Sequence, residues 1–285
     1  MIISFHPCFD SESQIILGDR TVDSEILGRI QNAEAIILPQ SCTEELFEAC
    51  LHTGALLFPD YRKRFEYPGK TGQSRLFRKL GLSHPETLCW ENVSAFKTKH
   101  GNLEKPPHKW PFILKEDRSH EAEGVYLADN PESLRISLDH IVLKEKSGPG
   151  RFVTQEFIDG GGNILRSVII GKNVISYWKR PSKPEQIITT ISRGAIIDHR
   201  WRPDMMEKGR KLALELSKKS GINLAAIDFV PDESKSDNEL FFLEINYYFG
   251  RRGIGGSERF YQLLFSALKA WLLENGINEQ SVRLV

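Results

Sequence analysis

Two short segments near the C-terminus constrain the fold most, because each places polar side chains inside an apolar pattern. One reads Ile-Asp-Phe at 227–229 and the other Leu-Glu-Ile-Asn at 243–246. Side chains alternate along a strand, so Glu244 and Asn246 share one face while the two apolar residues take the other. Asp228 is flanked by apolar residues in the same way. The chain is therefore expected to contain a sheet with two carboxylates and an amide among its core residues.

A metal ion is one explanation for such a sheet. Buried carboxylates are costly unless something compensates their charge, and a hard cation can do so. Oxygen-only ligands select Mg²⁺ or Mn²⁺, and Mg²⁺ commonly uses one or two carboxylates together with phosphates. On spacing alone, a sheet with one solvated polar face explains the pattern equally well.

Charge and cysteine content exclude several classes of protein. Lysine and arginine number 38, as do aspartate and glutamate, so the net charge is zero and no basic excess indicates nucleic-acid binding. The four cysteines form no Cys-x-x-Cys pair, which argues against a zinc site or a disulfide framework. No signal peptide and no membrane-spanning run are recognisable. We expect a cytoplasmic protein that binds neither nucleic acid nor membrane, and its oligomeric state stays open.

The order of apolar runs predicts three lobes. Residues 1–68 alternate short buried strands with helices and predict a small α/β lobe. Residues 69–148 begin with a helix and continue with two strand-like runs. Residues 149–285 combine a strand, a hairpin, a helix that begins at Pro203 and stops at Gly221, two further strands and a final helix. The predicted fold class is α/β for the first lobe and α+β for the other two.

Six further motifs occur in the order and spacing of a known superfamily. They are Gly69-Lys70 before a helix that leads to Gly-Leu-Ser-His-Pro-Glu-Thr at 81–87, Pro-Phe-Ile-Leu-Lys at 111–115, Gln-Glu-Phe-Ile at 155–158, Leu165-Arg166, Lys179-Arg180 and Ser192-Arg193-Gly194. With the polar strand residues, they resemble the ATP-grasp superfamily, specifically its branch of ribosomal-protein glutamate ligases and related carboxylate–amine ligases. The resemblance covers about residues 68–275. It implies a small α/β lobe followed by two α+β lobes that clasp ATP.

The resemblance also assigns roles to individual residues. The two lysines would contact ATP phosphates, although single lysines are often plain surface residues. The segment that joins the two ATP-holding lobes would meet adenine and ribose, and the arginines would contact phosphate or the acyl-phosphate. An arginine on a strand without such a role would lie on an exposed face. The assignments are Lys70 and Lys115 for phosphate, Glu156, Phe157, Ile158 and Asp159 for the nucleoside, Arg166, Arg180 and Arg193 for catalysis, and Asp228, Glu244 and Asn246 for Mg²⁺ or Mn²⁺.

Two arginines after the second polar strand are candidates for the substrate side. Arg251 and Arg252 lie in a loop framed by Gly250 and Gly253. Members of the family place substrate near this turn, and a guanidinium fork can bind a carboxylate through two hydrogen bonds. The alternative is a pair of solvated loop arginines.

Three positions depart from the family pattern. The flap at 116–124, glycine-rich in the family, has one glycine and four acidic residues, whose charge would oppose phosphate. Ile164 replaces an acidic residue two positions before Arg166, and Tyr-Tyr-Phe-Gly at 247–250 replaces a small-Pro-Gly turn after Asn246. These departures put the catalytic rate in question and favour an unusual substrate.

The expected activity is the ATP-dependent joining of a small carboxylate to an amine or peptide, through an acyl-phosphate and with release of ADP. Mg²⁺ or Mn²⁺ would neutralise charge on the transferred phosphoryl group. Two other functions stay open. One is a small-molecule kinase that stops after phosphorylation, and the other is a non-catalytic ATP-binding sensor, which the glycine-poor flap favours.

Overall fold

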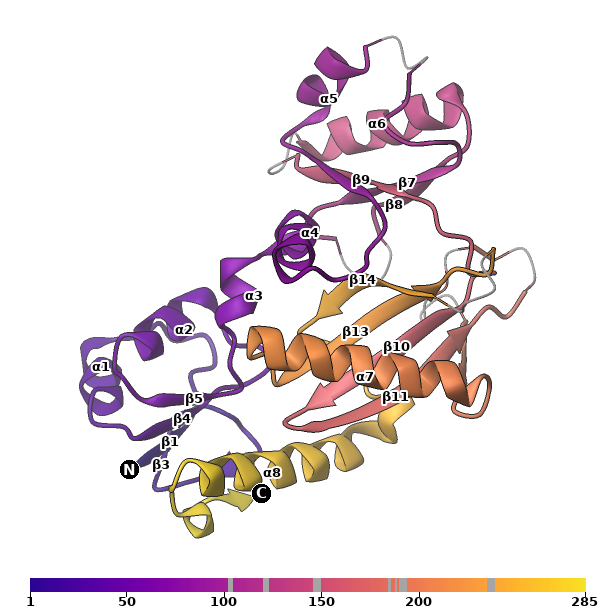
Figure 1. Ribbon diagram of the computed structural model, residues 1–285. Coiled ribbons are helices and arrows are strands. Elements are labelled where there is room, and N and C mark those ends of the chain that lie inside the picture. The colour runs from indigo at the N-terminus through magenta and orange to yellow at the C-terminus, as the bar shows by residue number, and fades with distance from the viewer. Residues whose placement is uncertain are drawn as a thin grey trace.

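The computed structural model describes residues 1–101, 105–119, 123–145, 150–183, 186–187, 189, 194–234 and 239–285. The chain forms three lobes, each built on its own sheet (Figure 1). The sheet of the first lobe is parallel and those of the second and third lobes are antiparallel, which confirms the predicted α/β and α+β class. Among the described helices, none is long and apolar enough to cross a membrane.

The first lobe is a four-stranded parallel sheet in the order β3-β1-β4-β5. Its strands are almost entirely apolar at their centre, as expected where helices or other lobes cover the faces of a parallel sheet. The elements are β1 (Ile2–Ser4), β3 (Ser13–Gln14), α1 (Ser24–Ile30), β4 (Ala35–Ile37), α2 (Glu44–Leu51), β5 (Leu56–Phe58) and α3 (Arg62–Glu66). Asp23 and Thr43 cap the first two helices through their side chains.

The second lobe is an antiparallel sheet in the order β6-β9-β7-β8, with two helices packed on it. Helix α4 (Gly69–Leu80) leads into this lobe, whose own elements are β6 (Thr87–Trp90), α5 (Val93–Lys99), β7 (Phe112–Glu116), β8 (Val125–Ala128), α6 (Pro131–Glu145) and β9 (Phe152–Glu156). β9 pairs with both β6 and β7, so it completes the sheet of the second lobe. A boundary at 148/149 would divide this sheet, and the chain instead leaves it after Glu156. The local sequence shows that β9 is a strand but not which strands it joins.

The third lobe is an antiparallel sheet in the order β12-β11-β10-β13-β14. Its elements are β10 (Ile164–Ile170), β11 (Asn173–Arg180), β12 (Ile196–Asp198), α7 (Pro203–Ser220), β13 (Leu224–Pro231), β14 (Leu240–Asn246), the short helix η2 (Arg252–Ile254) and α8 (Gly256–Glu274). The chain then returns to the first lobe through η3 (Glu279–Ser281), and β15 (Arg283–Leu284) pairs with β2 (Phe9–Asp10). Pro203 begins α7 and Gly221 ends it in the left-handed conformation, as predicted.

The two faces of the third sheet are covered differently. Helix α7 packs on one face, where Leu165 and Ile227 belong to a large buried cluster. Helix α8 packs on the opposite face, but only at the end that carries Val168 and Ala226. The other end of this second face carries the polar residues singled out in the sequence.

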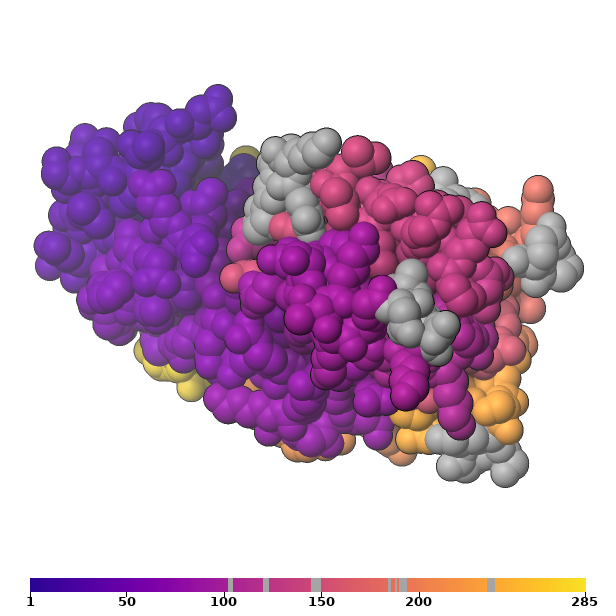
Figure 2. Space-filling model, turned by 90° about the horizontal axis from the view of Figure 1, so that it is seen from above, coloured from indigo at the N-terminus to yellow at the C-terminus, as the bar shows by residue number. Residues whose placement is uncertain are grey.

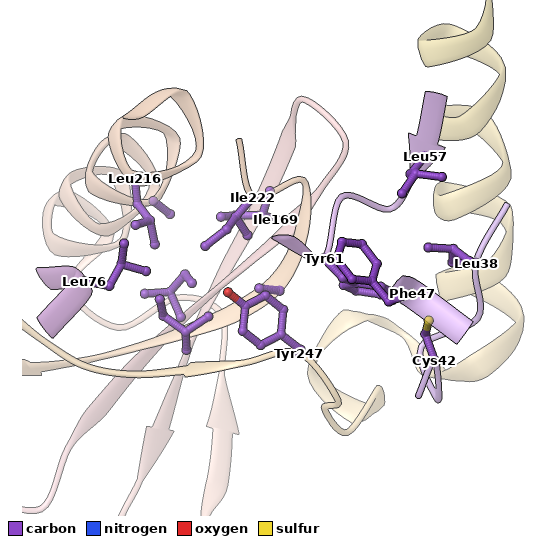
Figure 3. Close-up of a cluster of buried hydrophobic side chains, with 14 of the residues drawn as sticks. Leu38, Cys42, Phe47, Leu57, Tyr61, Leu76, Ile169, Leu216, Ile222 and Tyr247 are labelled. Atoms are coloured by element: carbon purple, nitrogen blue, oxygen red, sulfur yellow. The ribbon is translucent and has the colours of Figure 1, made fainter. Parts of the chain in front are cut away.

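The first and third lobes share a continuous core. Figure 3 shows Tyr61 and Phe47 of the first lobe beside Tyr247 of the third, with Leu76 of α4 and Leu216 of α7 in the same cluster. The second lobe's sheet has a separate core around α5 and α6. Seen from above, this lobe lies over the third, whose residues from α7 to β14 show in orange only at the rim (Figure 2). Because Leu76 and Phe77 of α4 belong to the core shared by the first and third lobes, this helix packs with those two lobes.

Candidate functional site

Four side chains lie opposite one another in a row across the third sheet. Tyr177 of β11 pairs in register with Arg166 of β10, Arg166 with Asp228 of β13, and Asp228 with Glu244 of β14. Asn246 follows Glu244 on the same face of β14. This is the end of the sheet that α8 leaves uncovered. The register therefore gathers two carboxylates, an amide and an arginine that lie far apart in the sequence.

Asp228 is the most tightly held residue of this row. Both of its oxygens accept from Arg166, at 2.7 Å from Nε and 2.6 Å from Nη2, and Lys179 Nζ donates to Oδ2 at 2.9 Å. All three residues are more than nine-tenths buried. Burial raises the pKa of the Asp228 carboxyl, but Arg166 and Lys179 outweigh it and hold that pKa well below its usual range. The carboxylate is thus charged and paired in the nucleotide-free chain.

Two lysines approach the polar row, Lys115 from β7 of the second lobe and Lys70 from α4. Lys115 Nζ donates to Gln155 Oε1 at 2.6 Å, and burial lowers its pKa to about 8. Lys70 Nζ donates to the carbonyl oxygen of Ser119 at 2.8 Å and lies 3.8 Å from Glu244 Oε1. Both lysines line one small pocket between α4, the second sheet and β14. The structure therefore brings the two predicted phosphate lysines to the edge of the polar row.

The charges of this cluster are unequal. Among the described residues, four cations surround two carboxylates, Asp228 and Glu244. The cations are Lys70, Lys115, Arg166 and Lys179. The positive charges outnumber the carboxylates by two, so the cluster is suited to an anionic ligand. Lys179 was noted in the sequence only as the neighbour of Arg180, and its alternation with Tyr177 along the strand is the signal that places it on this face.

The predicted metal ligands are adjacent. Glu244 lies opposite Asp228, and Asn246 Nδ2 lies 3.4 Å from Asp228 Oδ2. Glu244 is partly exposed, and Lys70 at 3.8 Å is its nearest described cation, so its oxygens are available to a ligand. Carboxylate and amide oxygens of this kind fit Mg²⁺ or Mn²⁺. The fit is direct for Glu244 and Asn246, whereas Asp228 can take part only if Arg166 or Lys179 shifts. Within the described ranges, no three His, Cys, Asp or Glu side chains form a metal-binding group on their own.

Of the three predicted catalytic arginines, the structure describes Arg166 and Arg180, which it does not bring together. Arg180 lies on the opposite face of β11 from Lys179, where its Nη1 donates to Asp198 Oδ2 at 2.9 Å and its guanidinium stacks 4.5 Å from the Trp201 ring centroid. Two backbone amides and Arg180 lower the pKa of the Asp198 carboxyl to about 2. Arg193 lies outside the described residues. Of the two described arginines, Arg166 is the one that belongs to the polar row.

The predicted nucleoside segment lies where the chain crosses from the second lobe to the third. Glu156 ends β9 with an exposed side chain, and its amide donates to the carbonyl of Glu86 at 2.9 Å. Phe157 and Ile158 are half-buried. Asp159 is exposed, and its Oδ1 accepts from the amide of Gly161 at 3.0 Å, so its carboxylate shapes a turn.

The proposed substrate arginines differ from each other. Arg251 donates to Gln40 Oε1 at 3.1 Å, and its guanidinium lies 4.5 Å from the ring centroids of both Phe260 and Tyr261. These contacts fix it between the first lobe and α8. Arg252 is exposed at the start of η2.

The loop that holds this pair rests on the polar row. A Cβ atom at Gly253 would lie 2.1 Å from the Tyr177 ring, so only glycine allows the approach. The substrate-side loop and the row of polar side chains are therefore in direct contact.

The flap's first two acidic residues are already paired. Glu116 accepts from Lys144 at 2.9 Å and from the Tyr126 hydroxyl at 2.8 Å. Asp117 accepts from the amide of Thr71 at 2.7 Å. These contacts occupy both carboxylates, whereas Glu123 of the same flap is exposed. Residues 120–122 of the flap lie outside the described part of the chain.

The fold and the matched segment together define the class of protein. Residues 74–259, well over half of the chain, match the RimK-like ATP-grasp domain, and the chain belongs to this family. The resemblance inferred from the sequence is thereby confirmed. The matched segment includes every predicted site residue except Lys70.

Individual relatives are distant. A probable alpha-L-glutamate ligase 2 from Hahella chejuensis is 27% identical over 182 residues, which are 63% of this chain and 55% of that protein. Beta-citrylglutamate synthase B from Homo sapiens is 23% identical over 170 residues, or 58% of this chain and 40% of that protein. The chain thus spans about half the length of the curated relatives that it matches.

Solved structures show the same fold at low identity. An ATP-grasp RimK domain protein from Sphaerobacter thermophilus superposes with a TM-score of 0.57 at 14% identity, covering 81% of this chain and 80% of that one. D-alanine–D-alanine ligase from Bacillus anthracis gives a TM-score of 0.58 at 11% identity, covering 92% and 87%. The ATP-grasp fold predicted from the sequence is therefore confirmed.

Proposed function

We propose that this chain is an ATP-dependent carboxylate–amine ligase. The observation that carries the proposal is the cluster of four cations around Asp228 and Glu244 at the uncovered end of the third sheet. Four cations around two carboxylates suit a polyphosphate better than a neutral ligand. The names of its relatives, a probable alpha-L-glutamate ligase and a beta-citrylglutamate synthase, support amide-bond formation. ATP as a substrate also favours the cytoplasm.

The proposed reaction has two steps. A substrate carboxylate oxygen attacks the γ-phosphorus of ATP, which releases ADP and gives an acyl-phosphate. An amine then attacks the acyl carbon, and phosphate leaves as the amide forms. The proton lost by the amine passes to solvent or to the departing phosphate.

The chain's own residues would bind and orient the phosphates. Lys70 of α4 and Lys115 of the second sheet would contact their oxygens, and Arg166 and Lys179 would do so from the third sheet. Glu244 and Asn246 would hold Mg²⁺ or Mn²⁺, which, when bound, neutralises phosphate charge. The exposed Arg252 would bind the substrate carboxylate, while Arg251 would support the loop from its position against two rings of α8.

The test is ADP release over a panel of amino acids, short peptides and amines in the presence of ATP and Mg²⁺. We expect release that needs both a carboxylate and an amine. The Glu244→Gln variant should lower turnover at least about a hundredfold, because the charge of one oxygen ligand is removed. Glu91→Gln, which changes a side chain 72% exposed on the second lobe, is the matched control and should retain full turnover.

The outcomes separate the alternatives. ADP release that needs a carboxylate but no amine would identify a kinase. Binding of ATP without turnover on any member of the panel would identify a sensor. A chain that neither binds ATP nor releases ADP would refute the proposal.

A further inference from the structure

Helix α4 begins without a capping side chain of its own. The residue at its N-cap position is Pro68, whose side chain makes no capping hydrogen bond. The first amides of a helix have no partner within the helix and need acceptors from elsewhere. Lys70 is the second residue of this helix, so whatever satisfies these amides also determines where Lys70 points.

Asp117, which directly follows β7, supplies acceptors for the amides of Lys70 and Thr71. Its carbonyl oxygen accepts from the amide of Lys70 at 3.0 Å, and its Oδ1 accepts from the amide of Thr71 at 2.7 Å. Its own amide donates to the carbonyl of Arg151 at 3.0 Å, which anchors it to the second lobe. Asp117 is buried, and its negative charge lies at the positive end of the α4 dipole.

Gly69 leaves the space that this arrangement needs. A Cβ atom at Gly69 would lie 2.6 Å from both carboxylate oxygens of Asp117, and the backbone there has a φ of +66°. A larger residue would therefore push the carboxylate away from the helix. The carboxylate occupies the place where a capping side chain of α4 itself would lie.

The turn that contains Asp117 also fixes the ammonium group of Lys70. Its Nζ donates to the carbonyl oxygen of Ser119 at 2.8 Å and to Ser119 Oγ at 3.1 Å, and Ser119 Oγ donates to the carbonyl of Glu116 at 3.1 Å. The turn from 116 to 119 thus holds both the start of the helix and the tip of the lysine. Lys70 reaches within 3.8 Å of Glu244 from this position.

We propose that Asp117 is a positioning residue for Lys70, acting as the N-cap of α4 from a different lobe. It also links two separate cores, because α4 packs in the cluster shared by the first and third lobes, whereas β7 belongs to the core of the second. The expected effect of Asp117 on ATP affinity rests on the proposed function, whereas its effect on the position of Lys70 does not.

The first experiment measures Lys70 directly in the nucleotide-free full chain. Reductive methylation followed by mass spectrometry reports the reactivity of each lysine, with the 81%-exposed Lys172 as internal reference. We expect Asp117→Ala to raise the labelling of Lys70 about three- to tenfold, the change that loss of a helix cap produces in a local equilibrium. Asp117→Asn keeps an oxygen acceptor and should restore most of the protection.

Asp23→Ala is the matched control, because Asp23 caps α1 through the amide of Ile26 at 2.9 Å, away from the site. It should leave the labelling of Lys70 unchanged. If Asp117→Ala does not fold, Gly69→Ala provides the second variant, since its Cβ would displace the carboxylate and raise the labelling similarly. Unchanged labelling of Lys70 in folded Asp117→Ala or Gly69→Ala, or an equal rise in Asp23→Ala, would overturn the assignment.

The second experiment connects Asp117 to ATP affinity through a double-mutant cycle measured by calorimetry. Asp117→Ala should weaken ATP binding several-fold in the wild-type background and have no further effect in the Lys70→Met background. A purely structural role would give the same loss in both backgrounds and refute the coupling. A wild-type chain that binds no ATP would refute the proposed function, and the labelling experiment would still decide the role of Asp117.

Discussion

The buried ion pairs of Asp228 provide the most demanding test of the site. Asp228→Asn removes the charge that neutralises Arg166 and Lys179, which are 9% and 5% exposed. Removing one partner of a buried pair leaves uncompensated charge and costs about 3–5 kcal/mol. We therefore expect the variant to lose about this much free energy of unfolding at pH 7 without nucleotide, measured by urea denaturation.

A control and a pH series sharpen this test. Asp198→Asn breaks a pair whose Arg180 partner is 40% exposed, and should cost less than about 1 kcal/mol. Although burial raises the pKa of Asp228, its two cations hold that pKa well below the unfolded value of about 3.9. A depressed carboxyl pKa contributes stability that is complete above about pH 4 and is lost as the pH falls. The difference between wild type and Asp228→Asn should thus shrink below about pH 4. A cost at pH 7 no larger than that of the control would refute the reasoning.

Two further predictions concern the lysine of β7 and the loop after β14. Burial lowers the pKa of Lys115 to about 8, so ATP affinity should fall as the pH rises above 8, by up to about tenfold per pH unit, while Lys115→Arg should remove this dependence. Calorimetry between pH 7 and 9 checks it, and a flat wild-type profile would contradict it. Gly253→Ala should lower stability by about 1–3 kcal/mol, because its Cβ would lie 2.1 Å from the Tyr177 ring, whereas Gly250→Ala meets no atom within 4 Å and serves as control. Thermal denaturation distinguishes them, and equal melting temperatures would count against the packing argument.

Local patterns in the sequence predicted much of the third lobe. Alternation along 243–246 placed Glu244 and Asn246 on one face, and Pro203 and Gly221 marked the ends of α7. These signals are short-range, so they can be read from neighbouring residues. The family motifs added the order of the lobes, which local patterns do not contain.

Contacts between distant residues could not be predicted in this way. Arg166 and Lys179 lie 62 and 49 positions from Asp228, and only the register of three strands brings them together. The sequence also shows that the flap is acidic, but not that Asp117 faces the start of α4. The sequence likewise does not show that Arg251 lies against the rings of Phe260 and Tyr261.

The pairing of Asp228 also affects how a nucleotide would leave. Arg166 and Lys179 already have an anionic partner in Asp228, so under the proposed function an arriving phosphate would exchange one set of ion pairs for another. The net gain is smaller than the attraction between the new partners, since the original pairs are lost. When the product departs, the two cations return to Asp228 and are neutralised at once. Such an internal counter-ion favours rapid turnover over tight retention.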